Sequence, residues 1–511
     1  MTGKCFLVGA GPGDPGLITV KGLKLLQEAE VVIYDFLANP ELLKHISPEA
    51  EVIYVGKKGG DHTLPQGEIN RLIVDQASLG KKIVRLKGGD PFIFGRGGEE
   101  AEELVKAHIP FEIVPGVTSA IAVPAYAGIP LTHRRYNTSV AFFTGHEDPT
   151  KEVPSRDLEK ETTGDQTLVF LMGVKNLSII VERLIRHGRD PETPAALIRW
   201  GTTTRQKTVT GTLQTIIRKA EEAALAPPAI LVVGKVVELR DTLNWFEQRP
   251  LFGKTLVITR TREGASGLAE RLADLGAECL EFPTIRIEPP SDWSELDQAI
   301  QQIEGYSWIF FTSPNGVRFF FDRLKGLRFD LRVLKGVKIG VIGPATAQAL
   351  AEFHLRPDLV PERYQAEYLL EALSGLSLSG QKVLIPRAEQ AREVLPEGLR
   401  NMGAEVQVVS AYKTLPAQEE KEPLEKKLSR GEIDCLTFTS SSTVINFLAL
   451  FPRQKILPLL KNVAIACIGP ITARTARDNG LQVTAVAEEY TIPGLVQAIE
   501  RHYSSKLKAQ S

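Results

Sequence analysis

The stretch RLKGGDPFIFGRGGEE, residues 85–100, determines how we interpret the fold of the first half of this chain. Apolar residues leading to Lys87 predict a strand, GGDP (88–91) predicts a turn, and GGEE (97–100) predicts the start of a helix with acids in its first turn. Five glycines and Asp90 are more than packing requires, so they predict a flat ligand held against the backbone. Because a phosphate site would favour Lys, Ser or Thr beside the glycines, Asp90 indicates a cationic or hydroxyl-bearing ligand.

A second glycine-rich turn, GAGPGD at residues 9–14, follows the first predicted strand. It is similar to the dinucleotide fingerprint GxGxxG, and Asp35 ends the next predicted strand, where a ribose-binding acid would stand. However, Asp14 replaces the third glycine, and Pro12 lacks an N–H for a pyrophosphate. Taken alone, the turn leaves open both a nicotinamide site and a tight strand–helix turn without a ligand.

The composition is typical of a globular protein with several domains. The 511 residues are 43% hydrophobic and 24% charged, which predicts three or four domains. A formal net charge of −1 predicts no global attraction to nucleic acid or membranes, and no apolar run approaches the roughly 18 residues that a membrane span needs. The four cysteines are scattered without a CxxC pair, so we expect a reducing cytoplasm and no metal site.

Short apolar runs alternate with amphipathic helical stretches along the chain, which predicts an α/β fold. A seam at residues 244–253 divides the chain, because a closing strand precedes it and a new strand–helix pair follows it. The predicted strands of the first half are residues 5–8, 31–34, 52–55, 83–86, 140–144, 167–171 and 230–233.

The second half contains an internal repeat. Such duplication predicts two similar α/β lobes, with a small-molecule site in the cleft between them. Hydroxyl residues follow predicted strands in both copies, at the starts of predicted helices. Capping is their ordinary structural role, but helix N-termini also bind anions. The matching segments are FTSPNGVRFF (311–320) with FTSSSTVINF (438–447), KIGVIGPATAQAL (338–350) with AIACIGPITARTA (464–476), and DLGAECLEFPTIRI (274–287) with NMGAEVQVVSAYKT (401–414).

Seven motifs of the first half occur in the order typical of one enzyme family. They resemble those of uroporphyrinogen-III C-methyltransferases, in the tetrapyrrole methylase superfamily, over residues 1 to about 245. The resemblance implies two α/β domains, about 1–115 and 116–245, with S-adenosyl-L-methionine (SAM) in the cleft between them. It also implies a homodimer formed through this half, and a fold other than the Rossmann methyltransferase fold. The motifs are VGAGPGDPGLIT, VIYDFL, VGKKGG, RLKGGDPFIFGRGGEE, VPGVTSAIAVPAYAGIPLTHR, FLMGV and LIRWGT.

The resemblance assigns roles to individual residues of the first half. Asp35 would be the proton acceptor and Lys57 the proton donor. The sequence departs from the family pattern at Leu171, where the family often has Tyr, and at residues 159–165, which resemble a short insertion. SAM would be held by Pro12, Gly88, Gly89, Asp90, Ile93, Thr118, Ser119, Met172 and Gly201. The basic residues that could face the carboxylates of a uroporphyrinogen, with a solvated surface as their ordinary alternative, include Arg96, His133 and Arg134.

The second half resembles uroporphyrinogen-III synthase over residues 254 to about 505, through FTSPNGV, IGPATA, VVSAYKT, FTSSSTV and IGPITA. The resemblance implies two flavodoxin-like lobes, about 254–286 plus 415–505 and about 288–411. Tyr412 matches a tyrosine that the family places near the hydroxyl group leaving the substrate, where it would donate a hydrogen bond; packing between the lobes is its structural alternative. The acid side chains of the substrate would be bound by Ser313, Thr346, Ser440 and Thr472.

Together, the halves predict a bifunctional enzyme with a methyltransferase at 1–245, a linker at 246–253 and a synthase at 254–511. The synthase would close hydroxymethylbilane to uroporphyrinogen III with inversion of the last ring. The methyltransferase would then methylate this product twice from SAM to give precorrin-2, for sirohaem or cobalamin. No nucleic-acid or membrane partner is expected. Two alternatives stay open: a methyltransferase carrying a non-catalytic bilobed ligand-binding module, and a nicotinamide dehydrogenase in the first half.

Overall fold

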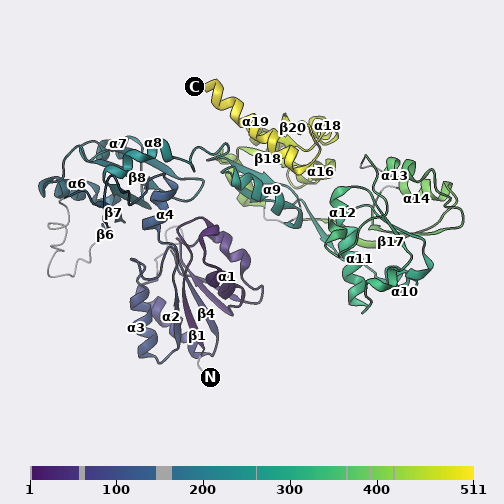
Figure 1. Ribbon diagram of the computed structural model, residues 1–511, viewed down its shortest axis with the longest axis horizontal. Coiled ribbons are helices and arrows are strands. Elements are labelled where there is room, and N and C mark those ends of the chain that lie inside the picture. Colours follow the sequence, from purple (N-terminus) through teal and green to yellow (C-terminus); the bar gives the residue numbers. More distant parts are fainter. Residues whose placement is uncertain are drawn as a thin grey trace. The chain divides into compact units, whose positions relative to one another are not determined.

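The computed structural model describes residues 3–56, 64–145, 164–260, 262–363, 366–391, 393–417 and 421–510. The chain divides into two compact units. One consists of Met1–Lys254 with Leu272–Glu278, and the other of Thr255–Arg271 with Cys279–Ser511. Each unit contains two five-stranded sheets flanked by helices (Figure 1). The predicted α/β class is therefore confirmed.

The first sheet is parallel throughout, with strand order β3-β2-β4-β1-β5. The central strands β1, β2 and β4 are mostly buried, as in other parallel sheets, whereas the edge strands β3 and β5 are partly exposed. Helix α1 covers one face and helices α2 and α3 cover the other, as Figure 1 shows around β1 and β4. The elements are β1 (Lys4–Gly9), α1 (Val20–Gln27), β2 (Val31–Tyr34), β3 (Glu51–Tyr54), α2 (Gln66–Ser78), β4 (Lys82–Lys87), α3 (Gly97–Lys106) and β5 (Phe111–Val114).

This strand order creates a switch point between β4 and β1. The two strands are neighbours, but the helix after β1 packs on one face of the sheet and the helix after β4 packs on the other. The chain after the two strands therefore leads to helices on opposite faces of the sheet, at its carboxyl edge. Ligands of open α/β sheets bind at such a point.

The second sheet of this unit is mixed, with strand order β6-β7-β10-β8-β9 and only β6 and β7 parallel. Helices α6 and α7 pack on one face, and α4 packs on the other. The predicted strands 31–34, 140–144 and 167–171 have the observed bounds. The elements are α4 (Ser119–Tyr126), β6 (Val140–Thr144), β7 (Thr167–Leu171), α6 (Leu177–Arg186), β8 (Pro194–Arg199), β9 (Lys207–Thr212), α7 (Ile216–Glu222) and β10 (Ala229–Val233).

The segment that follows this sheet, residues 245–247, packs against the domain that contains the sheet. The Trp245 indole N–H donates to the carbonyl of Ala125 (3.0 Å), and Phe246 is buried beside the ring of Tyr126. Glu247 Oε1 accepts hydrogen bonds from Gln206 Nε2 (2.8 Å) and the Thr208 hydroxyl (2.6 Å). Residues 245–247 therefore belong to the first unit.

The second unit repeats one plan twice. One sheet has the order β12-β11-β18-β19-β20, and the other has the order β13-β17-β16-β14-β15. The chain leaves the first of these sheets after β12, builds the second from β13 to β17, and returns to the first at β18. The strands are β11 (Thr255–Ile258), β12 (Glu278–Glu281), β13 (Ile285–Glu288), β14 (Trp308–Phe311), β15 (Lys338–Val341), β16 (Lys382–Ala388), β17 (Glu405–Pro416), β18 (Cys435–Phe438), β19 (Ala464–Cys467) and β20 (Val483–Val486).

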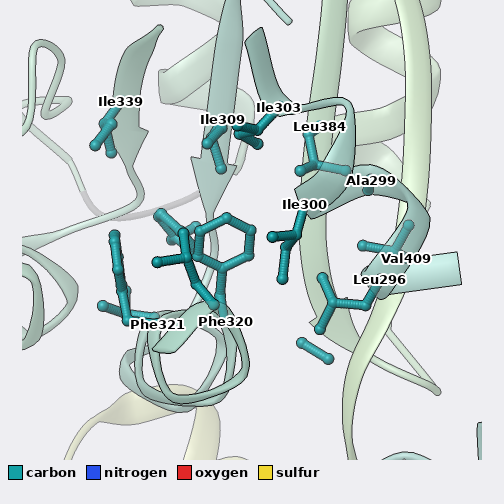
Figure 2. Close-up of a cluster of buried hydrophobic side chains, with 14 of the residues drawn as sticks. Leu296, Ala299, Ile300, Ile303, Ile309, Phe320, Phe321, Ile339, Leu384 and Val409 are labelled. Carbon is teal, nitrogen blue, oxygen red and sulfur yellow. The ribbon is translucent and has the colours of Figure 1, made fainter. Parts of the chain in front are cut away.

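The larger core of this unit lies under the β14–β17 sheet (Figure 2). Ile309 and Leu384 of the sheet face Ile300 and the phenylalanines at 320 and 321 of the covering helices. In the described ranges, no helix is long and apolar enough to cross a membrane. The helices are α9 (Arg262–Asp274), α10 (Ser294–Gln301), α11 (Pro314–Gly326), α12 (Pro344–Ala351), α13 (Ala366–Leu373), α14 (Val394–Asn401), α15 (Lys421–Ser429), α16 (Ser441–Ala449), α17 (Arg453–Leu459), α18 (Pro470–Asp478) and α19 (Ile492–Gln510).

Candidate active sites

Glycine backbones of three loops touch one another at the switch point. Gly11 and Gly89 form an isolated bridge, in which each N–H donates to the other's carbonyl at 3.2 and 2.7 Å. Both have positive φ angles, +77° and +70°, which glycine adopts without strain. A Cβ on Gly116 would lie 2.3 Å from the Gly89 carbonyl oxygen, and a Cβ on Gly9 would lie 2.5 Å from Gly116. Only glycine therefore permits this three-way contact.

The carboxylate of Asp90 holds this contact in place. Its Oδ1 accepts hydrogen bonds from the N–H groups of Phe92 (2.8 Å) and Ile93 (3.1 Å), and its Oδ2 accepts one from Gly116 N–H (3.0 Å). The sequence predicted that Asp90 faces a cationic or hydroxyl-bearing ligand. The structure adds two bonds that fix the loop after β4 and one, from Gly116 N–H, that joins it to the loop after β5.

Apolar side chains are exposed in the loops that follow β4 and β7. Ile93 follows the GGDP turn, and Met172 follows β7 with a left-handed φ of +56° that non-glycine residues rarely adopt. Thr118 caps α4 through a hydrogen bond from Ala120 N–H, and Ser119 is the first residue of that helix. Gly201 packs against Val123, which a Cβ would approach to 2.3 Å.

Two contacts join the two domains of this unit beside the glycines. The Tyr126 hydroxyl donates to Asp14 Oδ2 at 2.6 Å, and Asp14 N–H donates to the Thr202 hydroxyl at 3.1 Å. Burial and the carboxylate of Asp14 raise the pKa of Tyr126, so its hydroxyl remains a donor at neutral pH. The Phe36 and Trp200 rings also meet edge to face, 6.0 Å apart.

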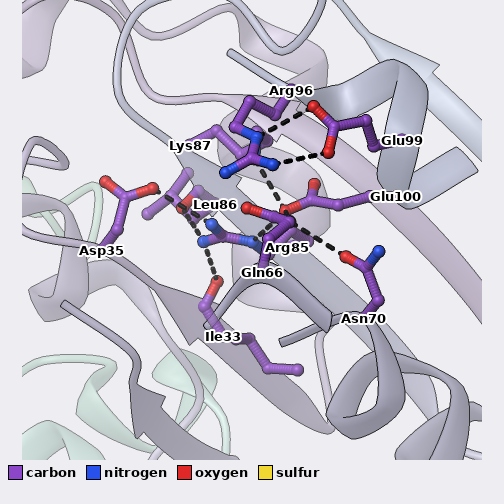
Figure 3. Close-up of polar contacts among 10 residues, drawn as sticks. All are labelled: Ile33, Asp35, Gln66, Asn70, Arg85, Leu86, Lys87, Arg96, Glu99 and Glu100. Carbon is purple, nitrogen blue, oxygen red and sulfur yellow. Dashed lines mark hydrogen bonds and ion pairs between the residues drawn. The ribbon is translucent and has the colours of Figure 1, made fainter. Parts of the chain in front are cut away.

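Asp35 directly follows β2 and is held by an arginine (Figure 3). Its Oδ2 pairs with Arg85 Nη2 at 3.2 Å, and its Oδ1 accepts a hydrogen bond from Leu37 N–H at 3.1 Å. The Asp35 side chain is 28% exposed, whereas the Arg85 side chain is 3% exposed. Asp35 therefore has a fixed orientation and remains accessible. Lys57, the predicted proton donor, lies outside the described residues.

The predicted substrate-binding residues of this half occupy two separate loops. Arg96 precedes α3 with a φ of +59°, and its exposed guanidinium pairs with Glu99 at 2.7 Å. His133 N–H donates to the Asn137 side chain at 2.8 Å, and its ring lies 5.1 Å from that of Tyr136. Arg134 is exposed.

In the β14–β17 sheet of the second unit, Tyr412 and Ser313 meet. The two hydroxyl oxygens are 3.0 Å apart, and Ser313 also caps α11 through a bond from Gly316 N–H (3.0 Å). Tyr412 is 8% exposed and stacks on Phe319. Burial raises the pKa of Tyr412, although the bond with Ser313 opposes this effect. The capping role predicted for Ser313 is therefore confirmed, and a tyrosine bonded to it lies at the same end of the sheet.

Hydroxyl residues occupy equivalent places in both sheets of the second unit. Ser440 caps α16 in a reciprocal box with Thr443, as Ser313 caps α11. Thr346 and Thr472 are buried in the first turns of α12 and α18, behind glycine N-caps that provide no side-chain bond. Each sheet thus has a serine-capped helix next to a helix whose N-terminal N–H groups have no side-chain cap.

Comparison with known proteins assigns the chain. A family model described as Tetrapyrrole (Corrin/Porphyrin) Methylases matches residues 4–217, and one described as Uroporphyrinogen-III synthase HemD matches residues 266–497. The porphyrin biosynthesis protein HemD of Ruminiclostridium josui is 41% identical over 96% of this chain and 97% of its own. The chain belongs to the family of fused tetrapyrrole methylases and uroporphyrinogen-III synthases. This assignment favours the methylase over the nicotinamide dehydrogenase that residues 9–14 left open.

Other relatives match part of the fused enzyme. The uroporphyrinogen-III C-methyltransferase of Bacillus subtilis (strain 168) is 44% identical over 70% of this chain and 72% of its own. A crystal structure of uroporphyrin-III C-methyl transferase from Thermus thermophilus, complexed with S-adenyl homocysteine, is 39% identical and has a TM-score of 0.40. It covers 46% of this chain and 94% of its own.

Sequence reasoning missed three charged residues of the methylase domain: Arg85, Lys87 and Glu100. All three are buried, Arg85 pairs with Asp35, and Glu100 pairs with both Arg85 and Lys87 (Figure 3). The signal was available in part, because Arg85 and Lys87 alternate with apolar residues in a strand that is otherwise fully buried. Their partner, Glu100, was identified only as a first-turn acid of the following helix.

Proposed function

We propose that this fused enzyme cyclises hydroxymethylbilane to uroporphyrinogen III in its synthase half and methylates that product twice from SAM to give precorrin-2. The observation that carries the proposal is the arrangement of loops at the switch point of the methylase sheet. Three glycine loops touch there, and a carboxylate held by Arg85 lies at the end of the adjacent strand β2. A site of this kind aligns two reactants, and alignment can lower the activation barrier by about 7–11 kcal/mol.

The residues of the loops at the switch point and of the neighbouring domain suit SAM. When bound, SAM supplies an activated methyl group. Backbone groups of the glycine loops, the hydroxyls of Thr118 and Ser119, and the exposed side chains of Ile93 and Met172 match a ligand with polar edges and an apolar face. The full proposed set is Pro12, Gly88, Gly89, Asp90, Ile93, Thr118, Ser119, Met172 and Gly201.

Asp35 has the position of a base in methyl transfer. After the methyl group is transferred, the macrocycle must lose a proton from another position, and Asp35 would accept it while Lys57 donates one. Arg85 keeps the Asp35 carboxylate from rotating, and the partial exposure of Asp35 leaves this carboxylate accessible to a substrate. The basic side chains Arg96, His133 and Arg134 would bind carboxylates of the macrocycle.

The synthase half would act by holding the linear substrate in one folded shape. Tyr412 keeps its proton because burial raises its pKa, so it can donate a hydrogen bond to the leaving hydroxyl. No side chain caps the helices behind Gly343 and Gly469, and helix N-termini of this kind can bind carboxylates. Ser313, Thr346, Ser440 and Thr472 would add hydroxyl donors to these sites.

Anaerobic incubation of the full chain with hydroxymethylbilane and SAM, followed by mass spectrometry, tests both activities. We expect a dimethylated type III macrocycle, and without SAM we expect uroporphyrinogen III. Formation of the type I isomer alone would contradict the synthase proposal. Preformed uroporphyrinogen III would then test the methylase separately, and an unmethylated product would contradict that half of the proposal.

A further inference from the structure

A cluster of buried charges lies next to Asp35 in the methylase domain (Figure 3). Arg85 and Lys87 are two residues apart on β4, so both point to the same face of the sheet. Glu100 of α3 meets them there, and all three side chains are at most 5% exposed. Glu100 Oε1 accepts hydrogen bonds from Arg85 Nε (3.1 Å), Lys87 Nζ (2.8 Å) and Gln66 Nε2 (3.2 Å).

Arg85 connects this cluster to Asp35. Its Nε donates to Glu100, its Nη1 donates to the carbonyls of Ile33 (3.4 Å) and Leu86 (3.1 Å), and its Nη2 donates to Asp35. A guanidinium is planar, so these bonds fix its orientation. Glu100 and Asp35 are therefore joined through one rigid cation.

The other oxygen of Glu100 contributes little to the stability of the fold. Oε2 is buried and has no hydrogen-bond partner among the described residues. A buried ion pair stabilises a protein only when its remaining lone pairs are satisfied, and apolar residues of similar volume often do as well. The charge of Glu100 therefore needs an explanation other than stability.

Counting charges provides one. When Asp35 is ionised, the cations of Arg85 and Lys87 balance the anions of Asp35 and Glu100. When Asp35 takes up a proton, the cluster carries one net positive charge. Without Glu100, it would carry one positive charge before the proton arrives and two afterwards. Burial already lowers the pKa of Lys87, so this site disfavours additional positive charge.

We infer that Glu100 is a positioning residue for methyl transfer, which acts through Arg85 to hold the Asp35 carboxylate where it can accept the substrate proton. The inference rests on the proposed role of Asp35. In that step the proton passes to a carboxylate oxygen of Asp35, and the electron pair of the broken bond stays in the macrocycle. The described charged or titratable groups that act on Asp35 are Arg85 and Lys87 of β4, Tyr54 of β3 and, through Arg85, Glu100 of α3.

The test compares Glu100→Gln with Glu103→Gln in the full chain. Glu103 is a partly exposed residue of the same helix, and it pairs with Lys106 outside the cluster. With preformed uroporphyrinogen III and SAM, we expect Glu100→Gln to lower kcat about tenfold or more with little change in KM. The acid limb of its pH profile should move to lower pH, because an anion is lost from the cluster next to the proposed base. We expect S-adenosylhomocysteine binding, measured by calorimetry, to be unchanged.

Lys87→Gln provides a test of opposite sign, and it decides the matter if Glu100→Gln does not fold. Removing a cation should move the acid limb to higher pH. The inference is wrong, and the cluster is structural, if the acid limb of both variants matches that of Glu103→Gln while their thermal stability falls. Asp35→Asn separates the two levels. If this variant keeps its activity, the proposed base and the inference fail together. If it is inactive while Glu100→Gln matches Glu103→Gln, only the inference fails.

Discussion

Tyr412 and Tyr306 have closely similar surroundings but different hydroxyl partners. Both are tyrosines of the same lobe and are 8% exposed. Tyr412 belongs to β17, and Tyr306 contacts that strand. Tyr306 donates to the Gln407 side chain, whereas Tyr412 meets Ser313 at the carboxyl end of β14. At the scale of the residue, a hydroxyl partner beyond the end of a strand distinguishes Tyr412, a candidate for chemistry, from Tyr306, a core residue with similar burial.

This pair provides a matched test of the synthase. Each Tyr→Phe change removes one hydroxyl and should cost about 1 kcal/mol of stability. We expect Tyr412→Phe to slow formation of uroporphyrinogen III about tenfold or more. We expect Tyr306→Phe to form it at the rate of the unaltered enzyme. Both rates are followed by chromatographic separation of type III from spontaneous type I product. Equal rates in the two variants would refute a role for the Tyr412 hydroxyl.

Glu112 on β5 makes the acid stability of the methylase domain testable. Its carboxylate bonds to Lys21 and to Lys4 (2.8 Å), and these partners lower its pKa from 4.5 to about 2. A depressed folded-state pKa stabilises the protein above the unfolded value, and this contribution disappears as the pH falls through the folded value. The stabilisation is therefore present above about pH 4.5 and is lost as the pH falls towards about 2.

We therefore expect Glu112→Gln to flatten the pH dependence of stability between these values. Urea midpoints measured from pH 5 downwards would check this expectation. Glu102→Gln is the control, because Glu102 is an exposed residue of α3 without a salt bridge in the described structure. If both variants followed the same pH curve, the ion pairs of Glu112 would contribute nothing in solution.

At the scale of the element, the methylase site is built from loops rather than from helices or strands. The carboxyl ends of β1, β4 and β5 each end in a glycine-bearing loop, and the three backbones touch because no Cβ separates them. The strands determine where the loops begin, and the glycines determine how closely they approach. A single added methyl group in this contact should therefore disturb ligand binding as well as stability.

Gly116→Ala tests this contact. Its Cβ would lie 2.3 Å from the Gly89 carbonyl oxygen, so the loops must separate. We expect a loss of about 1–3 kcal/mol of stability, as for other overpacked sites, and loss of S-adenosylhomocysteine binding by calorimetry. Gly98→Ala on α3 is the control, because its Cβ would meet nothing within 4 Å. Normal binding by Gly116→Ala would show that the ligand does not need the closed contact.

At the scale of the whole molecule, the chain consists of two compact units, and each has its own sheets and cores. The proposed site residues of the methylase lie in one unit, and those of the synthase lie in the other. Each unit is large enough to unfold cooperatively on its own. Ligands of one unit should therefore stabilise that unit alone.

Calorimetric unfolding should show two transitions. S-adenosylhomocysteine at a hundred times its Kd adds about 2.7 kcal/mol to the unit that binds it. For a unit of this size, that corresponds to a rise of about 5–10 °C in one Tm. The other Tm should not move, and NAD should move neither. One shared transition, or equal shifts of both, would contradict independent units.

The sequence by itself determined the features that depend on neighbours along the chain. The strands at 31–34, 140–144 and 167–171, and the serine caps at 313 and 440, follow from local patterns of apolar and hydroxyl residues. Only the tertiary structure decided that β4 lies between β2 and β1, because strand order depends on packing between distant segments. That order brings Arg85 to Asp35, fifty residues away in the chain, and the packing of α3 brings Glu100 to both cations. Asp90 was recognised from its motif, but its bond to Gly116 required the fold. Contacts of this kind arise between residues far apart in the chain, and no local pattern records which of them will meet.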